Sequence, residues 1–502
     1  MKKSDLFGIL ALISFSCAVS FAQNNNEIER RGSIAYHISI AADNPKIAQV
    51  NVRFTPKDSI LYMAQGGGNL PDRWATFVHK LKVTDSSGET MDVEDLQDAM
   101  WKLPSGIEEE ISLSYELHLD HEQHEWSGGL DGVAYSTDWG VFYTTRALLI
   151  LHSDHWKNIR VDFTLPDAWK VSTPWQPLNE RNTSFKVSGQ ASLMQSMLFA
   201  GTHRELSFKR DDFELVFALG GNEVLKEETL YKDLANGVLD YYIEIMGGLP
   251  NLPPNNPLDK AVVIINSADR TDGEVIGTNI SIMLEEGGDA MAKMISRFLF
   301  AHEFFHLWNG KSMVPDDQET EWFKEGFTNY YTLKALKQVG MLDDNAFYQV
   351  LNNLFYQRYI ADAGLGSIAM IQGEEKHDHW GIIYGGGLFI AMAQDAIIRE
   401  ASGNTRSIDD LMRDIFTTYG GTHNHYTIDD ILHGVTELSG EDQSPFFKKY
   451  IQGKEPIPIE NYLPKVGIKA WVQDGQLVLE TASALTKLQS EMLEGVFGRI
   501  EK

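Results

Sequence analysis

The amino-acid sequence predicts a multidomain α+β protein, in which an N-terminal antiparallel β domain precedes a mainly helical domain. Apolar and polar residues alternate with a period of two from about residue 31 to residue 217, as in half-buried strands. After the Gly220-Gly221 pair the apolar period becomes helical, and helical periodicity dominates residues 289–454. This change of period predicts a domain boundary near residue 221.

Each strand of the β domain is predicted by its own alternating run. The apolar positions are Ile34, Tyr36, Ile38 and Ile40, then Ala48, Val50, Val52 and Phe54, then Ile111, Leu113, Tyr115, Leu117 and Leu119, and then Ile159, Val161 and Phe163. Turn-forming stretches separate these runs, for example the Asp-Ser-Ser-Gly sequence at 85–88. Because each strand has one apolar and one polar face, we expect an antiparallel sandwich or a curved sheet.

The second half of the chain opens with a helical segment at about 226–246, followed by a proline-rich loop and a short apolar strand. The tail after residue 455 holds a strand-like piece and a helical end, and it is too short to form a domain. We therefore expect a β domain at 23–220, a mainly helical domain at 221–455 and a tail at 456–502.

Residues 1–22 have the pattern of a signal peptide. Two lysines precede an apolar run that is too short to span a bilayer, and small residues precede a cut ahead of Gln23. We expect export to the periplasm or the cell exterior, and no membrane span elsewhere. Ser14 stands where lipoprotein signals carry an aliphatic residue, which argues against a lipid anchor at Cys17.

The composition is that of a globular protein, with 43% hydrophobic residues in a chain of 502. The net charge of −28 repels nucleic acid, so no nucleic-acid partner is expected. Cys17 is the only cysteine, and its removal with the signal peptide leaves no disulfide and no thiolate ligand. Any bound metal must therefore be held by histidine, glutamate or aspartate.

The segment from His302 to His306 has the pattern HExxH. Residues four apart on a helix share a face, so both imidazoles point at one metal ion while Glu303 reaches the attacking water. Glu325 follows in a second helical segment and supplies a third ligand, which leaves one position of a tetrahedral zinc open. Asn329, one turn beyond Glu325, is either a residue that orients a ligand or a plain helix-surface amide.

The run from His302 to Lys311, then Pro315, then the run from Trp322 to Tyr331, resembles the glycyl aminopeptidase family of gluzincin metallopeptidases. It resembles more distantly the aminopeptidase N family, in which the HExxH motif and the glutamate have the same spacing. The resemblance implies a thermolysin-like catalytic domain at 221–455. It also implies one Zn²⁺ ion on His302, His306 and Glu325, with Glu303 as general base and peptides as substrates.

In both families a tyrosine in a Tyr-x-Lys-Gly motif stabilises the oxyanion, and Tyr384 occupies the matching place. Gly386 stands where the motif has lysine. The other interpretation is that Tyr384 is an ordinary core residue before a glycine turn. Many family members end in a PDZ domain, and the tail at 456–502 has room for a remnant of one at most.

The family implies removal of a small N-terminal residue, glycine or alanine, and a carboxylate for the free amine. Glu274 is the nearest candidate by position, although its surroundings match the family's recognition motif poorly, and an exposed loop carboxylate is the alternative. An endopeptidase without a free-amine requirement is therefore a second hypothesis. A non-catalytic binding protein on a peptidase fold is a third, which the intact ligands and base oppose. The sequence leaves the oligomeric state open.

Two further histidine groups are interpreted from their neighbours. His118, His121 and His124 follow a strand among acidic residues and are predicted to be a solvated strand end. His377 and His379 precede Tyr384, so they either line the cleft or lie outside it.

Overall fold

The computed structural model describes residues 32–119, 134–152, 156 and 158–498. The predicted signal peptide, Cys17, His121 and His124 lie outside the described residues. The chain forms two compact units. Unit 1 comprises residues 1–228 and 260–296, and unit 2 comprises residues 229–259 and 297–502. The predicted domain limits at 220 and 455 stay predictions.

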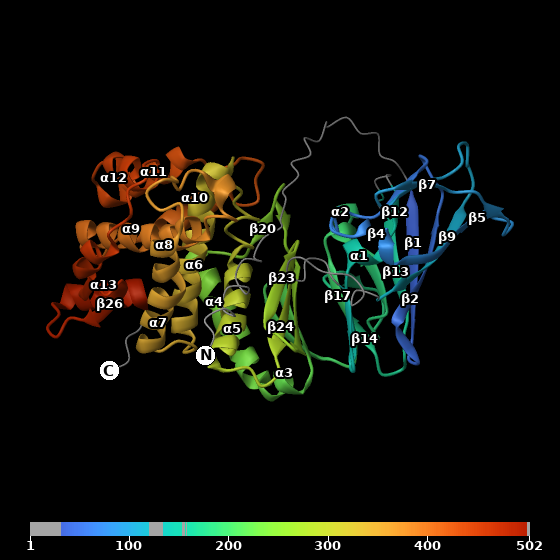
Figure 1. Cartoon of the computed structure of the whole chain (residues 1–502), viewed down its shortest axis with the longest axis horizontal. Coiled ribbons are helices and arrows are strands. Elements are labelled where there is room, and N and C mark those ends of the chain that lie inside the picture. Colours follow the sequence, from blue (N-terminus) through green and yellow to red (C-terminus); the bar gives the residue numbers. More distant parts are fainter. Residues whose placement is uncertain (1–31, 120–133, 153–155, 157, 499–502) are drawn as a thin grey trace. The chain divides into compact units, whose positions relative to one another are not determined.

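The largest sheet of unit 1 has eight strands, with β1, β2 and β9 at its centre (Figure 1). In sheet order the strands are β15 (Gln176–Pro177), β16 (Ser184–Val187), β13 (Asn158–Thr164), β1 (Ser33–Ala41), β2 (Asn44–Phe54), β9 (Ile111–His118), β5 (Val78–Thr84) and β6 (Thr90–Met91). All neighbours are antiparallel except β1 and β13, which pair in parallel. The alternating runs do not reveal this pair, because a period of two is the same for both strand directions.

The alternation predicted for these strands matches their burial. In β9, for example, Ile111, Leu113, Tyr115 and Leu117 are buried and the residues between them are half-buried. Two four-stranded sheets complete this half of unit 1: β10 (Tyr135–Thr137), β11 (Gly140–Thr144), β17 (Met197–Gly201) and β14 (Lys170–Ser172), and β12 (Leu151–His152), β3 (Ile60–Tyr62), β8 (Met100–Lys102) and β7 (Glu94–Gln97). Most of their buried side chains join one hydrophobic core with those of the large sheet, whereas Phe142, Met197 and Phe199 belong to a separate cluster with Val216 and Val262.

A five-stranded sheet forms the rest of unit 1. Its order is β18 (Arg204–Arg210), β19 (Phe213–Gly220), β22 (Lys260–Ala268), β24 (Asn279–Glu285) and β23 (Asp272–Ile276). The three central strands are parallel, and an antiparallel strand lies at each edge. Strand β22 fulfils the prediction of a buried apolar strand. Helix α5 (Ala290–Phe305) begins in this unit and ends in unit 2.

Unit 2 is mainly helical, as predicted (Figure 1). Its longer helices are α4 (Glu228–Met246), α6 (Glu321–Gln338), α9 (Gly387–Ser402), α10 (Ile408–Tyr419) and α11 (Ile428–Ser439), and its shorter ones include α7 (Asp344–Val350), α8 (Gln357–Ala361) and α12 (Ser444–Tyr450). Helices α6 and α9 approach closely where Gly326 meets Gly387, since a Cβ atom on Gly326 would lie 2.2 Å from the carbonyl carbon of Gly387. Only glycine fits at this crossing.

Among the described residues, one helical stretch, at 381–402, is long and apolar enough to cross a membrane. Within its most apolar window 94% of the residues are buried inside the protein, so it is the core helix of unit 2.

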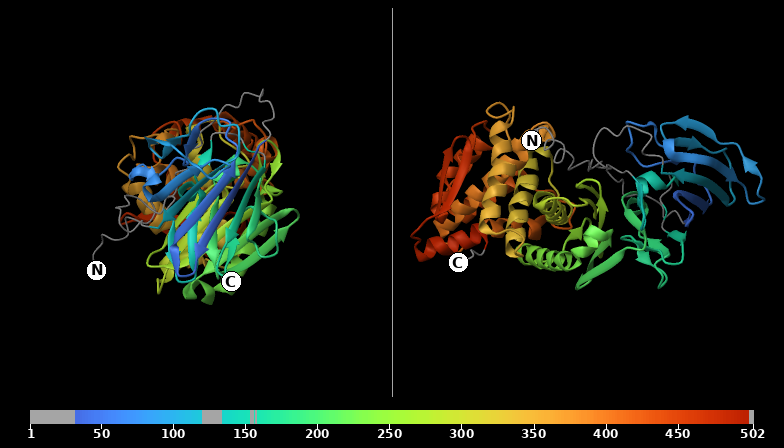
Figure 2. Two further views of the ribbon diagram at one scale, coloured as in Figure 1. Left: turned by 90° about the vertical axis from the view of Figure 1, so that its right-hand side faces the viewer. Right: turned by 60° about the horizontal axis from the view of Figure 1, so that its bottom comes forward.

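The C-terminal tail is part of unit 2. Strands β25 (Ile468–Gln473) and β26 (Gln476–Thr481) form a hairpin, and α13 (Lys487–Phe497) follows it (Figure 2). The Leu477 amide donates to Oδ1 of Asn352 over 2.8 Å, and Nη2 of Arg399 donates to the Gly495 carbonyl over 3.3 Å. These bonds attach the hairpin and the last helix to the helices of unit 2.

Candidate metal centre

Helix α5 supplies the first four residues of the HExxH motif, and His306 lies in the turn directly after the helix. The Nε2 atoms of His302 and His306 are 3.2 Å apart. His302 is buried, and His306 is half-buried. The four-residue spacing therefore brings both imidazoles together, as predicted from helix geometry.

Glu325 completes the cluster from helix α6. Its Oε2 atom lies 3.5 Å from Nε2 of His302 and 3.3 Å from Nε2 of His306. Three atoms bound at about 2.0–2.1 Å to a tetrahedral zinc ion lie roughly 3.3–3.4 Å from one another, so all three separations fit a single ion. In the part of the chain that the structure describes, this is the one group of three or more such residues close enough to share a metal.

The hydrogen bonds around the cluster also fit a metal. Nδ1 of His306 lies 2.9 Å from the carbonyl oxygen of Asn309, which only accepts, so Nδ1 carries the proton and Nε2 presents a lone pair. Oε2 of Glu325 is buried and has no hydrogen-bond donor among the described residues. A buried carboxylate oxygen without a donor is costly, and a cation there would satisfy it.

The cluster has a strongly perturbed electrostatic environment. Burial raises the pKa of Glu325, but His306, Lys324 and Lys376 outweigh it and hold that pKa well below its usual value. Burial raises the pKa of Glu303 to about 7, and the nearby Glu325 carboxylate adds to the rise. Glu325 is thus ionised, as a ligand must be, whereas Glu303 can take up and release a proton near neutral pH.

Tyr384 lies in the helical segment η6 (Gly381–Gly386), which leads directly into α9. Its ring is 6.4 Å from the His302 ring and nearly parallel to it, at 25°. Trp380 also stacks on Tyr384, with ring centroids 5.2 Å apart and an angle of 11° between the ring planes. Asn329 is buried and donates from Nδ2 to the Tyr384 carbonyl over 3.3 Å, so it is not a surface amide.

A Cβ atom on Gly386 would lie 2.5 Å from Cε of Met370 and 3.0 Å from the Tyr359 ring, so a larger residue there would displace the end of the Met370 side chain. The neighbouring Gly387 is restricted more strongly, since its Cβ would lie 2.2 Å from the Trp322 carbonyl oxygen.

Glu274 lies on the edge strand β23 of unit 1, opposite Ser281, and it is half-buried. It is a strand residue, not a loop residue as the alternative interpretation expected. The metal cluster belongs to unit 2, and a role for Glu274 in substrate binding stays a prediction.

The remaining histidines lie outside the cluster. His118 ends β9, where Nε2 lies 2.9 Å from a carboxylate oxygen of Glu116, in line with a strand-end position. His379 pairs through Nδ1 with Asp362 over 2.7 Å, and His377 is exposed.

Three charged residues near Glu325 were not predicted from the sequence. Lys324 and Lys376 pair with Glu325, and Glu321 pairs with both lysines. Glu321 and Lys324 lie one turn or less from Glu325 on the same predicted helix, and this helical spacing was an available signal. Lys376 comes from a distant loop, and no spacing predicts its contact.

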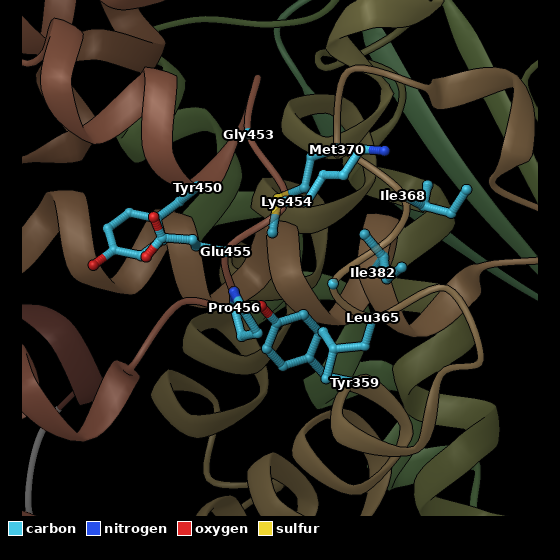
Figure 3. Close-up of a pocket in the computed structure, with 11 residues that line it drawn as sticks. Tyr359, Leu365, Ile368, Met370, Ile382, Tyr450, Gly453, Lys454, Glu455 and Pro456 are labelled. Atoms are coloured by element: carbon cyan, nitrogen blue, oxygen red, sulfur yellow. The ribbon is translucent and has the colours of Figure 1, made fainter.

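A small pocket also occurs in unit 2, lined by residues of the Tyr359–Ile382 region and by the segment around 453–456 (Figure 3). Tyr359, Leu365, Met370 and Ile382 line it together with Lys454 and Glu455. None of its lining residues belongs to the metal cluster, so this pocket is not the candidate site.

Two histidines and a glutamate at tetrahedral spacing, with a second glutamate beside them, define a metallopeptidase of the HExxH type. Residues 35–202 match the family model of the peptidase M61 N-terminal domain, and residues 296–366 match that of the M61 glycyl aminopeptidases. Both matches are to the M61 glycyl aminopeptidase family, and together with the metal cluster they show a metallopeptidase whose substrates are peptides.

A solved structure supports the fold. The chain is similar to the crystal structure of an aminopeptidase N family protein from Idiomarina loihiensis, with a TM-score of 0.71 and 17% sequence identity. The match covers 88% of this chain and 79% of that one. No curated protein sequence matches the chain.

Proposed function

We propose that this protein is a single-zinc aminopeptidase that removes a small residue, glycine or alanine, from the N-terminus of peptides. The observation that carries the proposal is the cluster of His302, His306 and Glu325, whose three ligand atoms have the spacing of a tetrahedral zinc site. Its nitrogen and oxygen donors suit zinc, and no thiolate is required. The family that the chain matches supports both the metal and the reaction.

Glu303 is the proposed general base. Its carboxylate takes the proton from the attacking water and then delivers it to the nitrogen of the leaving amine. The pKa of about 7 that burial gives this group supports both transfers near neutral pH. When bound, the zinc ion supplies Lewis-acid chemistry, since it polarises a carbonyl oxygen and makes water a stronger acid.

Tyr384 is the proposed oxyanion donor. Its ring lies beside the His302 ring, and the Trp380 stack restricts its orientation. A hydroxyl held in place donates to the oxygen that becomes negative in the tetrahedral state, which stabilises the transition state more than the bound substrate. Asn329 is the proposed positioning residue, because it fixes the backbone of Tyr384 from the helix that carries Glu325.

Recognition of the free amine needs a carboxylate, because a buried ammonium without a partner is costly. We propose Glu274 for this part, on the basis of its position in the family pattern. The endopeptidase hypothesis stays as the second candidate, favoured by the poor match of residues 272–279 to that pattern. The N-terminal 22 residues support export of the mature enzyme as a further proposal.

Peptides that differ only at the N-terminus test the specificity. Hydrolysis of Gly- and Ala-initiated peptides is compared with that of the same peptides carrying an acetylated amine. An aminopeptidase cleaves only the free forms, and Glu274→Ala raises KM for these forms alone. If the acetylated peptides are cleaved equally fast, the endopeptidase hypothesis replaces the aminopeptidase proposal.

A further inference from the structure

Four charged side chains form a closed ring of alternating sign at the metal cluster. Lys324 Nζ lies 2.6 Å from Oε1 of Glu321 and 3.5 Å from Oε1 of Glu325. Lys376 Nζ lies 2.6 Å from Oε2 of Glu321 and 3.4 Å from the same Oε1 atom of Glu325. Each carboxylate therefore faces two ammonium groups, and each ammonium group faces two carboxylates.

The two carboxylate oxygens of Glu325 face different groups. Oε1 faces both lysines, whereas Oε2 faces the two histidine Nε2 atoms. The four side chains are between 3% and 16% exposed, so water screens these contacts far less than it screens surface ion pairs. Their formal charges cancel, which makes the burial of the whole set tolerable.

The backbone brings Lys376 to the ring through an unusually close approach. Lys376 follows the short helical turn η5 (Gly373–Glu375), and a Cβ atom on Gly373 would lie 1.9 Å from the Gln318 carbonyl oxygen and 2.8 Å from Cβ of Glu321. Only glycine lets this loop lie against the start of α6. The contact of Lys376 with Glu321 and Glu325 therefore depends on glycine at position 373.

We propose that Glu321, Lys324 and Lys376 are positioning residues that hold Glu325 as a ligand through one oxygen only. The inference rests on the proposed zinc site. A free carboxylate offers two oxygens to a cation, and binding through both would fill the fourth position of a tetrahedral zinc ion. By holding Oε1, the two lysines keep that position open for water or substrate.

A competing electrostatic explanation makes a different prediction for one variant. If the ring only tuned the local charge, removing the positive charge of Lys376 would strengthen the binding of a cation. If the ring positions Glu325, the same removal weakens binding, because the carboxylate loses its fixed orientation. Glu321→Gln does not separate the two explanations, because it weakens binding under both, by removing a negative charge and releasing both lysines.

Zinc affinity of the mature chain, measured by competition with a chelator, tests the inference. Lys376→Met should weaken zinc binding by about 10- to 100-fold, as for other groups that orient metal ligands, and Lys376→Arg should bind almost as wild type does. Cobalt(II)-loaded Lys376→Met should also have an altered visible spectrum, because a second glutamate oxygen then takes the position that is open to water in the wild type. Lys449→Met is the matched control, because it removes an exposed lysine that pairs with Glu455.

Three outcomes would count against the inference. Zinc binding by Lys376→Met that equals or exceeds wild-type binding, with an unchanged cobalt spectrum, overturns it and leaves the zinc site intact. A wild-type chain that binds no zinc overturns the proposed function as well. If Lys376→Met fails to fold, Lys376→Gln replaces it, and unaltered zinc binding in that variant overturns the inference equally.

Discussion

Asn329 donates a hydrogen bond to the backbone carbonyl of Tyr384 over 3.3 Å and links two segments that lie far apart in the sequence. Asn329 follows Glu325 by one helical turn on α6, and Tyr384 precedes α9. The bond therefore connects the helix of the third metal ligand to the segment of the proposed oxyanion donor. The adjacent crossing of Gly326 and Gly387 brings these two helices close enough for it.

Asn329→Ala should impair both stability and turnover. Removing the amide deletes one buried hydrogen bond to the Tyr384 carbonyl, which still accepts from the Gly387 amide, and should cost about 0.5–1.5 kcal/mol of unfolding free energy. Because the backbone of Tyr384 then loses a restraint, kcat should fall while zinc content is retained. Urea unfolding and steady-state kinetics measure the two effects, and a variant with unchanged kcat would show that Asn329 has no part in positioning Tyr384.

Tyr384→Phe isolates the hydroxyl group from the packing of the ring. An oxyanion donor acts chiefly in the transition state, so kcat should fall by about 10²-fold or more with little change in KM. The stacking with Trp380 and the bond from Asn329 do not involve the hydroxyl, so both should be kept in this variant. Normal turnover in this variant would mean that the Tyr384 hydroxyl does not stabilise the oxyanion and that Tyr384 is an ordinary core residue.

Asp395 in helix α9 should be important for stability. Its fully buried carboxylate accepts hydrogen bonds from the Tyr330 hydroxyl at 2.6 Å, Arg399 Nε at 2.9 Å and the Ile408 amide at 3.0 Å. Asp395→Ala leaves the Arg399 guanidinium buried without this partner, which should cost about 3–5 kcal/mol.

A surface pair provides the control for Asp395. Glu400 lies on the same helix as Asp395 and forms an exposed ion pair with Lys465. Glu400→Gln breaks this pair and should lower the unfolding free energy by less than about 1 kcal/mol. Chemical unfolding of both variants measures the difference. Equal, small losses would mean that the buried network around Asp395 contributes little.

His203 should make unit 1 less stable in mild acid. Burial lowers the pKa of His203 to about 4, against a weaker opposing effect of the Glu205 carboxylate. An unfolded histidine titrates near pH 6.5, so between about pH 6.5 and pH 4 the unfolded chain binds a proton that the folded chain does not. This histidine therefore contributes stability above about pH 6.5 that is lost as the pH falls toward 4, up to roughly 3 kcal/mol.

Comparing wild type with His203→Gln removes the contributions of all other titrating groups. The difference in unfolding free energy between the two proteins should shrink as the pH falls from 7 to 4. A difference that is constant over this interval would mean that His203 has the same pKa in the folded and unfolded states.

The parts of the structure that the sequence predicts are those with a local period or motif. The alternation around Tyr115 predicts strand β9, and the four-residue spacing of His302 and His306 predicts a shared helix face. The parallel pairing of β1 with β13 and the contact of Lys376 with Glu325 join distant segments. Their partners are chosen by tertiary packing, which leaves no period in the sequence.

The zinc content of the purified protein and of two variants shows directly whether His302, His306 and Glu325 hold one zinc ion. We expect one zinc ion per chain in the wild type, one in an inactive Glu303→Gln variant, and none in His306→Ala, because only the last change removes a ligand. A wild-type chain with no zinc or with two ions after gentle purification would contradict this expectation, and so would a Glu303→Gln variant that is as active as wild type.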